Sequence, residues 1–301
     1  MSLNTLDVKL TPRKETDCYR VLMNDSALDV LKLIFEFKLC TGCHVSRFIS
    51  QKDKSRYVYM KLRRMWQAGF LESFKVFSHS FVGASLYYML SKQGLEALEQ
   101  YAYYERSRLK VYPNTKTLLD WGLFKHEAQV VELASIEVMN KGTGLDISFK
   151  GEHSSVAYDQ YRNFEALTPD YTVYYKLGEE EVEHCIYTEF ERTLKSKSAI
   201  LRKIQRYADY LKFLEPQDQK NKTLRIIFET PKMEAAFWLN LYLNKPDLLR
   251  YVHIRTTHLS LIKESKDFFE AIYCSDITVE FVRGRHLSMD TTKKVKMFEG
   301  V

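Results

Sequence analysis

The sequence lacks the features that mark several common classes of protein. It has five cysteines at scattered positions in 301 residues, which argues for reduced thiols and against a framework of paired disulfides. It has no run of about 18 uncharged apolar residues that would span a bilayer. Its first residues lack the apolar core of a secretory signal. We therefore expect a cytoplasmic protein that makes no membrane contact.

Several catalytic and cofactor signatures are also missing. The chain has no glycine-rich phosphate loop, no spacing typical of a Ser/His/Asp triad and no set of four zinc ligands. Cys40, Cys43 and His44 do form a Cys-x-x-Cys-His string, which on paper is a c-type haem attachment site. Such haem is attached outside the cytoplasm, and zinc needs further ligands. We expect no haem at these three residues.

The sequence does contain enough apolar residues for two packed domains. It also contains one concentrated basic segment. Hydrophobic residues make up 45% of the chain and aromatic residues 14%. Residues 41–70 carry seven basic residues against a single acid, Asp53, so this segment accounts for the whole net charge of +6. Such a basic block is typical of a nucleic-acid contact, although a solvated helix face has the same composition.

The first third of the chain has the pattern of three helices followed by a β-hairpin. An apolar helical stripe follows the cap-like Asp25 and Ser26, a short helix covers 44–50, and a third helix runs from Ser55 to a stop at Gly69. Strand-like runs over 70–77 and 85–91 flank a loop that carries Gly83.

This order predicts a winged helix-turn-helix domain over residues 20–112, including one helix of about twenty residues after the hairpin. It places Cys40 at the end of the first helix, and Cys43 with His44 at the start of the second. The Cys-x-x-Cys-His string is then incidental to the turn between the two helices.

In a winged helix the third helix enters the major groove of DNA while neighbouring side chains hold phosphates. Val58, Leu62 and Met65 form the inward face of this helix, and Gln67 lies on the opposite face with the basic residues. The groove candidates are Arg56, Tyr57, Met60 and Arg64, with Arg63 beside them. The phosphate candidates are Arg47, Lys52, Lys54 and Lys61. The alternative is a winged helix that binds protein.

The rest of the chain, residues 118–301, has the pattern of a second domain. A helix is predicted over 123–139, with further helices over 197–213 and 231–243. Strands are predicted over 145–152, 170–177, 182–191 and 224–230, with a hairpin turn at Gly178. This alternation predicts an α/β domain with a mixed sheet, and therefore an α+β protein overall.

Three carboxylates are expected to converge in this second domain. Glu189 and Glu191 lie two residues apart on one predicted strand and so face the same side. Asp170 begins the neighbouring antiparallel strand. Three hard oxygen ligands at one sheet edge suit Mg²⁺ or Mn²⁺, which polarise phosphodiesters and activate water. For each acid alone, a turn residue or a solvated strand edge is the simpler reading.

These residues carry a resemblance to a known fold. Pro169-Asp170 followed after 19 residues by Glu189 resembles the PD-(D/E)xK restriction-endonuclease-like fold. His126-Glu127, then Pro-Asp, then Glu-x-Glu-Arg-Thr, then Lys203-Ile-x-x-Tyr207 behind a winged helix resembles the replication-relaxation family of plasmid and conjugative-element proteins. The resemblance implies that Glu127 is a third metal ligand with Asp170 and Glu189.

The sequence departs from the nuclease pattern at one position. The pattern requires Glu-x-Lys, and Glu191 stands where the lysine is expected. The resemblance allows this lysine to move to the following helix, where Lys203 is the candidate. The implied catalytic set is Asp170, Glu189, Glu191 and Lys203.

Two functions follow for the chain, and a third remains open. The first is a Mg²⁺- or Mn²⁺-dependent endonuclease that nicks DNA in plasmid replication control or conjugative mobilisation. The second is a non-catalytic DNA-binding scaffold with a degenerate nuclease fold, and the third is a transcriptional regulator. The partners implied are double-stranded DNA, a relaxase or replication protein, and a second copy in a homodimer.

Overall fold

The computed structural model describes the chain in segments and divides it into two compact units, Met1–Met139 and Asn140–Val301. All structural statements below concern the described residues, which are 7–11, 21–77, 85–110, 112–118, 120–139, 145–154, 167–177, 183–193, 197–212, 214, 221–265, 268, 273–274, 278–282 and 286–290. The predicted loop at Gly83 and the predicted turn at Gly178 lie outside these residues. Within the described ranges, no helix combines the length and hydrophobicity that a membrane span requires.

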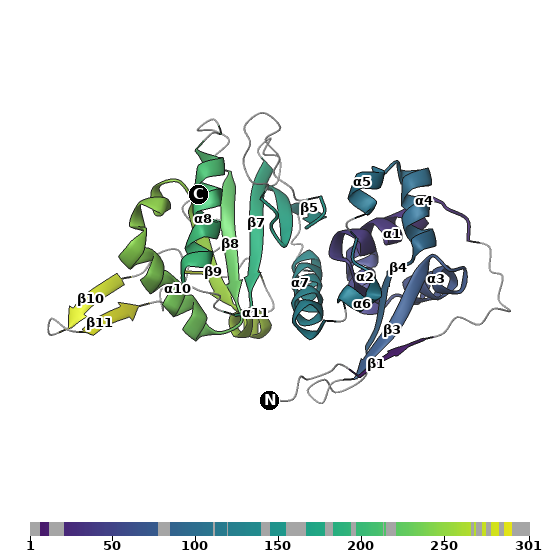
Figure 1. Ribbon diagram of the computed structural model, residues 1–301, viewed down its shortest axis with the longest axis horizontal. Helices are drawn as coiled ribbons and strands as arrows, with labels where there is room; N and C mark the ends of the chain where they lie inside the picture. Colours follow the sequence, from purple (N-terminus) through teal and green to yellow (C-terminus); the bar gives the residue numbers. More distant parts are fainter. Residues whose placement is uncertain are drawn as a thin grey trace. The chain divides into compact units, whose positions relative to one another are not determined.

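The first unit combines helices with a four-stranded antiparallel sheet of order β1-β3-β4-β2 (Figure 1). Its elements are β1 (Asp7–Leu10), α1 (Asp25–Phe37), β2 (Cys40–Thr41), α2 (Gly42–Ser50), α3 (Arg56–Gln67), β3 (Leu71–Phe77), β4 (Ser85–Leu90), α4 (Lys92–Ala102), α5 (Arg106–Leu109), α6 (Thr115–Leu118) and α7 (Trp121–Met139). The predicted order of three helices and two strands is confirmed.

Local signals explain where the first three helices begin and end. The side chain of Asn24, rather than Asp25 or Ser26, caps α1 by accepting a hydrogen bond from the Ala27 N–H. Gly69 ends α3 with a positive φ of 90°, and the N–H of Phe70 reaches the carbonyl of Met65. This is a Schellman ending, which favours glycine because a Cβ atom is strained at that φ.

Two parts of the first unit differ from the sequence prediction. The single helix expected after the hairpin is broken at Tyr103, which has a φ of 56°, so that α4 and α5 are separate. The predicted second domain starts at 118, whereas the boundary between the units falls after Met139 and α7 packs against α1 and α2. Side chains on nearly every side of α7 are buried, including Val131, Ala134 and Glu137.

The second unit is built on a mixed five-stranded sheet of order β5-β6-β7-β8-β9 (Figure 1). β5, β6 and β7 are antiparallel neighbours, and β7, β8 and β9 run parallel to one another. The elements are β5 (Leu145–Gly151), β6 (Tyr171–Leu177), β7 (Glu183–Glu191), α8 (Lys197–Leu211), β8 (Lys222–Phe228), α10 (Pro231–Asn244), η1 (Pro246–Arg250), β9 (His253–His258), α11 (Leu259–Ser265), β10 (Thr278–Val282) and β11 (His286–Asp290). The predicted mixed sheet is confirmed.

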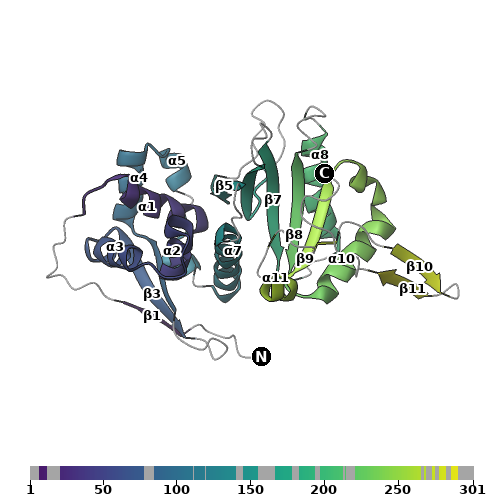
Figure 2. The same cartoon turned by 180° about the vertical axis from the view of Figure 1, so that it is seen from behind.

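The two long helices α8 and α10 cover the same face of this sheet. They lie in front of the strands in Figure 1 and behind them in Figure 2. Ile204 and Tyr207 of α8 and Trp238 of α10 belong to one core cluster with Leu224 of β8 and Ile254 of β9. Burial of this apolar surface fixes the inward side of α8, and so fixes which of its polar residues face the sheet.

Candidate functional site

Glu189 and Glu191 occupy one face of β7, the central strand of the five, and both are buried. Their exposed fractions are 3% and 8%, and every residue from Cys185 to Glu191 is buried. The simpler reading of a solvated strand edge is therefore wrong. Two carboxylates withdrawn from water in this way need a nearby cation or proton to compensate their lost hydration.

Lys203 of α8 supplies that cation. Its Nζ atom lies 2.8 Å from Glu189 Oε2 and 2.8 Å from Glu191 Oε1, so one ammonium bridges both acids. One turn further along α8, the hydroxyl of Tyr207 donates to Glu189 Oε1 at 2.8 Å. Positions 203 and 207 face the same side of the helix, which is why both side chains reach β7.

Asp170 lies beside this group, just before β6. Its Oδ2 atom accepts a hydrogen bond of 2.6 Å from the N–H of Phe190, the residue between the two glutamates. The pairing of Tyr171 with Thr188 brings the start of β6 to this part of β7. The structure thus brings together Asp170, Glu189, Glu191 and Lys203, and we refer to these four with Tyr207 as the carboxylate cluster.

The protonation of the carboxylate cluster reflects competition between burial and charge. Burial raises the pKa of Glu189 from 4.5 to about 7, against the opposing effect of Lys203, and the charge of Asp170 adds to the rise. Burial disfavours the charged form of Lys203, but Glu189 and Glu191 outweigh it and raise the pKa of its ammonium. Lys203 therefore stays protonated while Glu189 gains or loses a proton near neutral pH.

The oxygen ligands of the cluster are of the type that Mg²⁺ and Mn²⁺ prefer. Among the described side chains, however, no group of three or more His, Cys, Asp or Glu residues is arranged to hold a metal ion. Glu127, the further ligand implied by resemblance, lies on α7 in the first unit, where its Oε1 is 2.5 Å from Lys38 Nζ. Its role as a metal ligand stays a prediction.

The outward face of α3 forms a second candidate site, in the first unit. Val58, Leu62 and Met65 are buried as predicted. The residues exposed on α3 are Arg56, Tyr57, Tyr59, Met60, Arg63 and Arg64, and we call them the α3 surface. Tyr59 is one of them that the sequence reasoning did not select. Gln67 was expected on this face and is instead buried.

The basic residues around the α3 surface do not all have the same surroundings. Lys52 and Lys54 are exposed between α2 and α3. Lys61 donates a hydrogen bond to Ser26 and its ammonium lies 4.9 Å from the centre of the Tyr57 ring. The hydrogen bonds of Lys61 and Ser26 lower the pKa of the Tyr57 hydroxyl.

Arg47, by contrast, is held by acids within the unit. Its Nε lies 2.8 Å from Asp53 Oδ1 and its Nη1 lies 2.9 Å from Glu132 Oε1 on α7. Burial raises the pKa of Glu132, but hydrogen bonds from His44 and Arg47 outweigh burial and bring it to about 2. Because two carboxylates already share the charge of Arg47, we do not propose this residue as a phosphate contact.

The Cys-x-x-Cys-His string has a structural role. Cys40 lies in β2, not at the end of α1 as predicted, while Cys43 and His44 open α2 as predicted. His44 Nδ1 accepts the Thr41 N–H in a capping box, so its Nε2 donates to Glu132 at 2.7 Å. Burial raises the pKa of both thiols, which keeps them protonated.

A polar group that the sequence reasoning missed lies at the same sheet edge as Glu191. Glu191 pairs with Phe228, and Phe228 pairs with His258 at the end of β9. His258 Nε2 is 4.0 Å from Glu234 Oε2, and its Nδ1 is 2.7 Å from Ser260 Oγ. Parallel strands present their carboxyl ends at one edge of a sheet. A correct prediction of β9 would therefore have placed His258 beside Glu191.

The two units therefore define a mixed α+β protein with a basic helix surface in one unit and a carboxylate cluster in the other. Residues 31–226, from α1 to β8, match a family model described as replication-relaxation. This match covers more than half of the chain, and the protein belongs to the replication-relaxation family. No curated protein and no solved structure matches the chain.

Removing the Lys203 ammonium should destabilise the protein in a pH-dependent way. We expect Lys203→Met to lower the free energy of unfolding by about 2 kcal/mol at pH 8, a value reduced from that of a fully buried pair because the lysine side chain is 36% exposed. Because the folded state raises the pKa of Glu189 from 4.5 to about 7, the stability that this glutamate contributes is present below pH 4.5 and is lost as pH rises through 7. The negative charge on Glu189 that Lys203 compensates is present at pH 8 and mostly absent at pH 5. The deficit should therefore shrink at pH 5.

Urea denaturation of the wild type and the variant at the two pH values measures this effect. Lys232→Met is the matched control, because Lys232 is exposed in the first turn of α10 and its loss should change stability by no more than about 0.5 kcal/mol. An equal deficit for Lys203→Met at pH 5 and pH 8 would show that the lysine contributes packing rather than charge.

Proposed function

We propose that this protein binds and cleaves DNA during the replication or relaxation of a plasmid or other mobile element. In this proposal the first unit is a winged helix that places the α3 surface in the major groove of duplex DNA. The second unit is a PD-(D/E)xK-like domain whose carboxylate cluster holds Mg²⁺ or Mn²⁺ and nicks a phosphodiester. The observation that carries the proposal is the Lys203 ammonium 2.8 Å from both Glu189 and Glu191.

Two features of the first unit support the winged-helix part of the proposal. The order α1, β2, α2, α3, β3, β4 is that of a helix-turn-helix followed by a β-hairpin wing. The helix in the recognition position carries exposed Arg56, Arg63 and Arg64 together with exposed Tyr57 and Met60. Arginine can read guanine edges or hold phosphates, and apolar groups can contact thymine methyls.

The position of Lys203 supports the nuclease part. The lysine that the nuclease pattern expects two residues after Glu189 is absent from β7, and Lys203 brings an ammonium to the same place from α8. Its side chain is partly exposed, whereas the glutamates are buried, so a phosphate can approach the cluster from the side of the lysine. This geometry suits a Lys203 ammonium that binds both glutamates and also contacts the substrate phosphate.

The residues present also fit a hard divalent metal. Mg²⁺ keeps several waters and needs only one or two protein carboxylates, with the substrate phosphate completing its shell. Asp170 and Glu189 would hold it, with Glu191 as the neighbouring acid, and it would polarise the phosphodiester and lower the pKa of a bound water. Tyr207 holds Glu189 in place, and Lys203 stabilises negative charge on the phosphate oxygens.

The second candidate function is a DNA-binding scaffold or regulator without cleavage. The observation in its favour is that Lys203 already neutralises the two glutamates, so the cluster forms a stable ion-pair group without a metal. A fold of nuclease type does not by itself imply nuclease activity. The experiment below separates the two functions.

Cleavage is tested with supercoiled plasmid and the purified protein in Mn²⁺ or Mg²⁺. We expect conversion to the open circle, and we expect Glu189→Gln to reduce it to background because the amide cannot replace the carboxylate as a metal ligand. The control is Glu229→Gln, a change at a half-buried glutamate 4.0 Å from Arg192 and outside the cluster. A gel shift without nicking under any of these conditions would favour the scaffold.

Duplex binding is tested through its salt dependence. We expect Arg56→Ala with Arg64→Ala to weaken affinity for plasmid fragments and to make the slope of log affinity against log salt shallower by about two units. The control is Lys92→Ala with Arg106→Ala, which removes two charges whose side chains are 92% and 77% exposed elsewhere in the unit. Equal losses for both pairs would contradict the assignment of the α3 surface.

A further inference from the structure

A basic and aromatic stripe runs along the outer side of α8. Arg202, Arg206 and Tyr210 follow one another at intervals of four residues, so they share one face of the helix. Lys203 and Tyr207 lie on the inner side, in the carboxylate cluster. Arg202 and Arg206 are exposed, whereas Tyr210 is half-buried with its ring centre 6.3 Å from that of Tyr187 in an edge contact.

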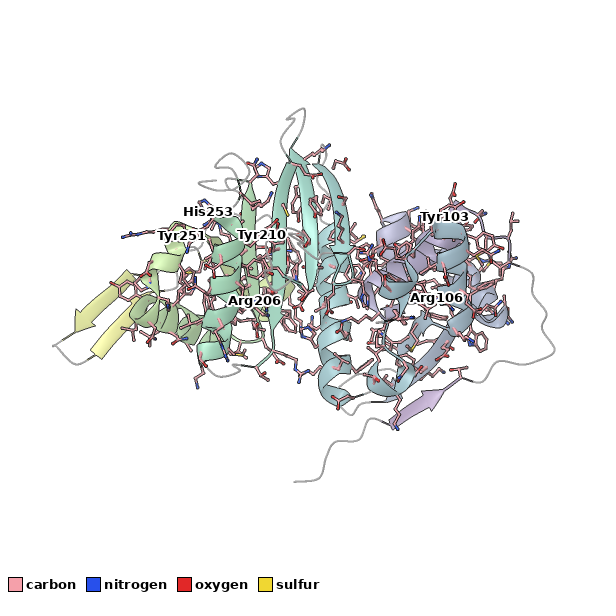
Figure 3. All side chains as sticks on the ribbon, turned by 45° about the horizontal axis from the view of Figure 1, so that its top comes forward. Tyr103, Arg106, Arg206, Tyr210, Tyr251 and His253 are labelled. Carbon is pink, nitrogen blue, oxygen red and sulfur yellow. The ribbon has the colours of Figure 1, made fainter. Side chains whose placement is uncertain are left out.

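The stripe ends in a group of rings. Tyr251 follows η1 with 42% of its surface exposed, and the Lys212 ammonium lies 4.3 Å from the centre of its ring. His253, the first residue of β9, is also exposed. Figure 3 labels Tyr210, Tyr251 and His253 toward the end of α8 that leads to Lys212, with Arg206 further along the helix. We call Arg202, Arg206, Tyr210, Lys212, Tyr251 and His253 the α8 stripe.

The charge and chemistry of the α8 stripe fit a particular ligand. Its three fixed charges are positive, and Asp209 beside it is engaged by Gln205 at 2.9 Å and by Lys212 at 3.5 Å. Cations that follow a backbone together with exposed aromatic rings are the means by which proteins hold unpaired strands, because each base offers a face for stacking. Duplex DNA keeps its base faces covered and offers only phosphates here.

We propose that the α8 stripe binds single-stranded DNA. Arg202 and Arg206 contact phosphates, while the exposed ring of Tyr251 stacks on a base. Binding of an unpaired strand is independent of the α3 surface, and only the choice of DNA over RNA rests on the proposed function.

The position of the stripe gives this binding a consequence. Arg202 precedes Lys203, so one end of the stripe lies beside the carboxylate cluster. The helix rises about 15 Å from Arg202 to Lys212, which matches about four nucleotides at the 3.4 Å spacing of a stacked strand. A strand bound at Tyr251 can therefore follow α8 to the cluster.

The test is fluorescence anisotropy of a labelled oligothymidylate of about 16 nucleotides with the full chain. We expect Arg206→Ala with Tyr251→Ala to weaken binding by at least about tenfold. The matched control is Arg106→Ala with Tyr103→Ala, which removes the same residue types at exposed positions in the first unit (Figure 3). The control should change affinity by less than about twofold, and Tyr251→Phe should retain the wild-type affinity.

An abasic oligonucleotide of the same length separates stacking from charge. Tyr251→Ala should leave its affinity unchanged, whereas Arg206→Ala should weaken it. Urea denaturation checks that both variants keep the wild-type unfolding midpoint, and duplex affinity, which belongs to Arg56 and Arg64, should be unaffected by either change. Loss of duplex binding in the Arg56 and Arg64 variant with single-strand binding retained would leave this proposal standing.

Two results would overturn the proposal. The first is wild-type affinity for oligothymidylate in the Arg206 and Tyr251 variant, or a loss no larger than that of the control pair. The second is tighter binding of an oligouridylate of the same length, which would assign the stripe to RNA instead of DNA.

Discussion

Glu189 and Glu191 point to the same side of β7 because alternate residues of a strand share a face, and that side is covered by α8. Two acids buried together would repel one another and lose hydration, unless a cation lay between them. Lys203 is that cation, and its position depends on the packing of Ile204 and Tyr207 in the core beneath α8. The packing of α8 in the core therefore determines the geometry of the carboxylate cluster.

The same arrangement connects the cluster with the outer surface of the helix. When the inner side of α8 is fixed by Lys203 and Tyr207, its outer side must present Arg202 and Arg206. One helix therefore holds the acids on one side and presents exposed positive charge on the other. In the proposed function both sides act on the same polymer, the first on a phosphodiester and the second on the strand that contains it.

Local patterns predicted much of this structure, and residues distant in sequence decided the rest. The spacing of Glu189 and Glu191, and the helix that carries Lys203, follow from strand and helix periodicity. β9 was missed because Arg255, Thr256, Thr257 and His258 are polar yet buried, whereas buried parallel strands are usually apolar.

Contacts between residues distant in sequence, and very short strands, could not be predicted from local sequence patterns either. The role of Arg47 depends on Glu132, 85 residues away, and such a pairing leaves no local pattern. β1 has only four residues and forms because it pairs with β3.

The central proposal is that the carboxylate cluster is a metal site. Anomalous diffraction from crystals of the full chain soaked in Mn²⁺ tests it most directly. The metal-site proposal predicts an anomalous peak beside oxygens of Asp170 and Glu189, with the Lys203 ammonium displaced from Glu189. Lys203 still bridging both acids, with no peak at saturating Mn²⁺, would contradict it.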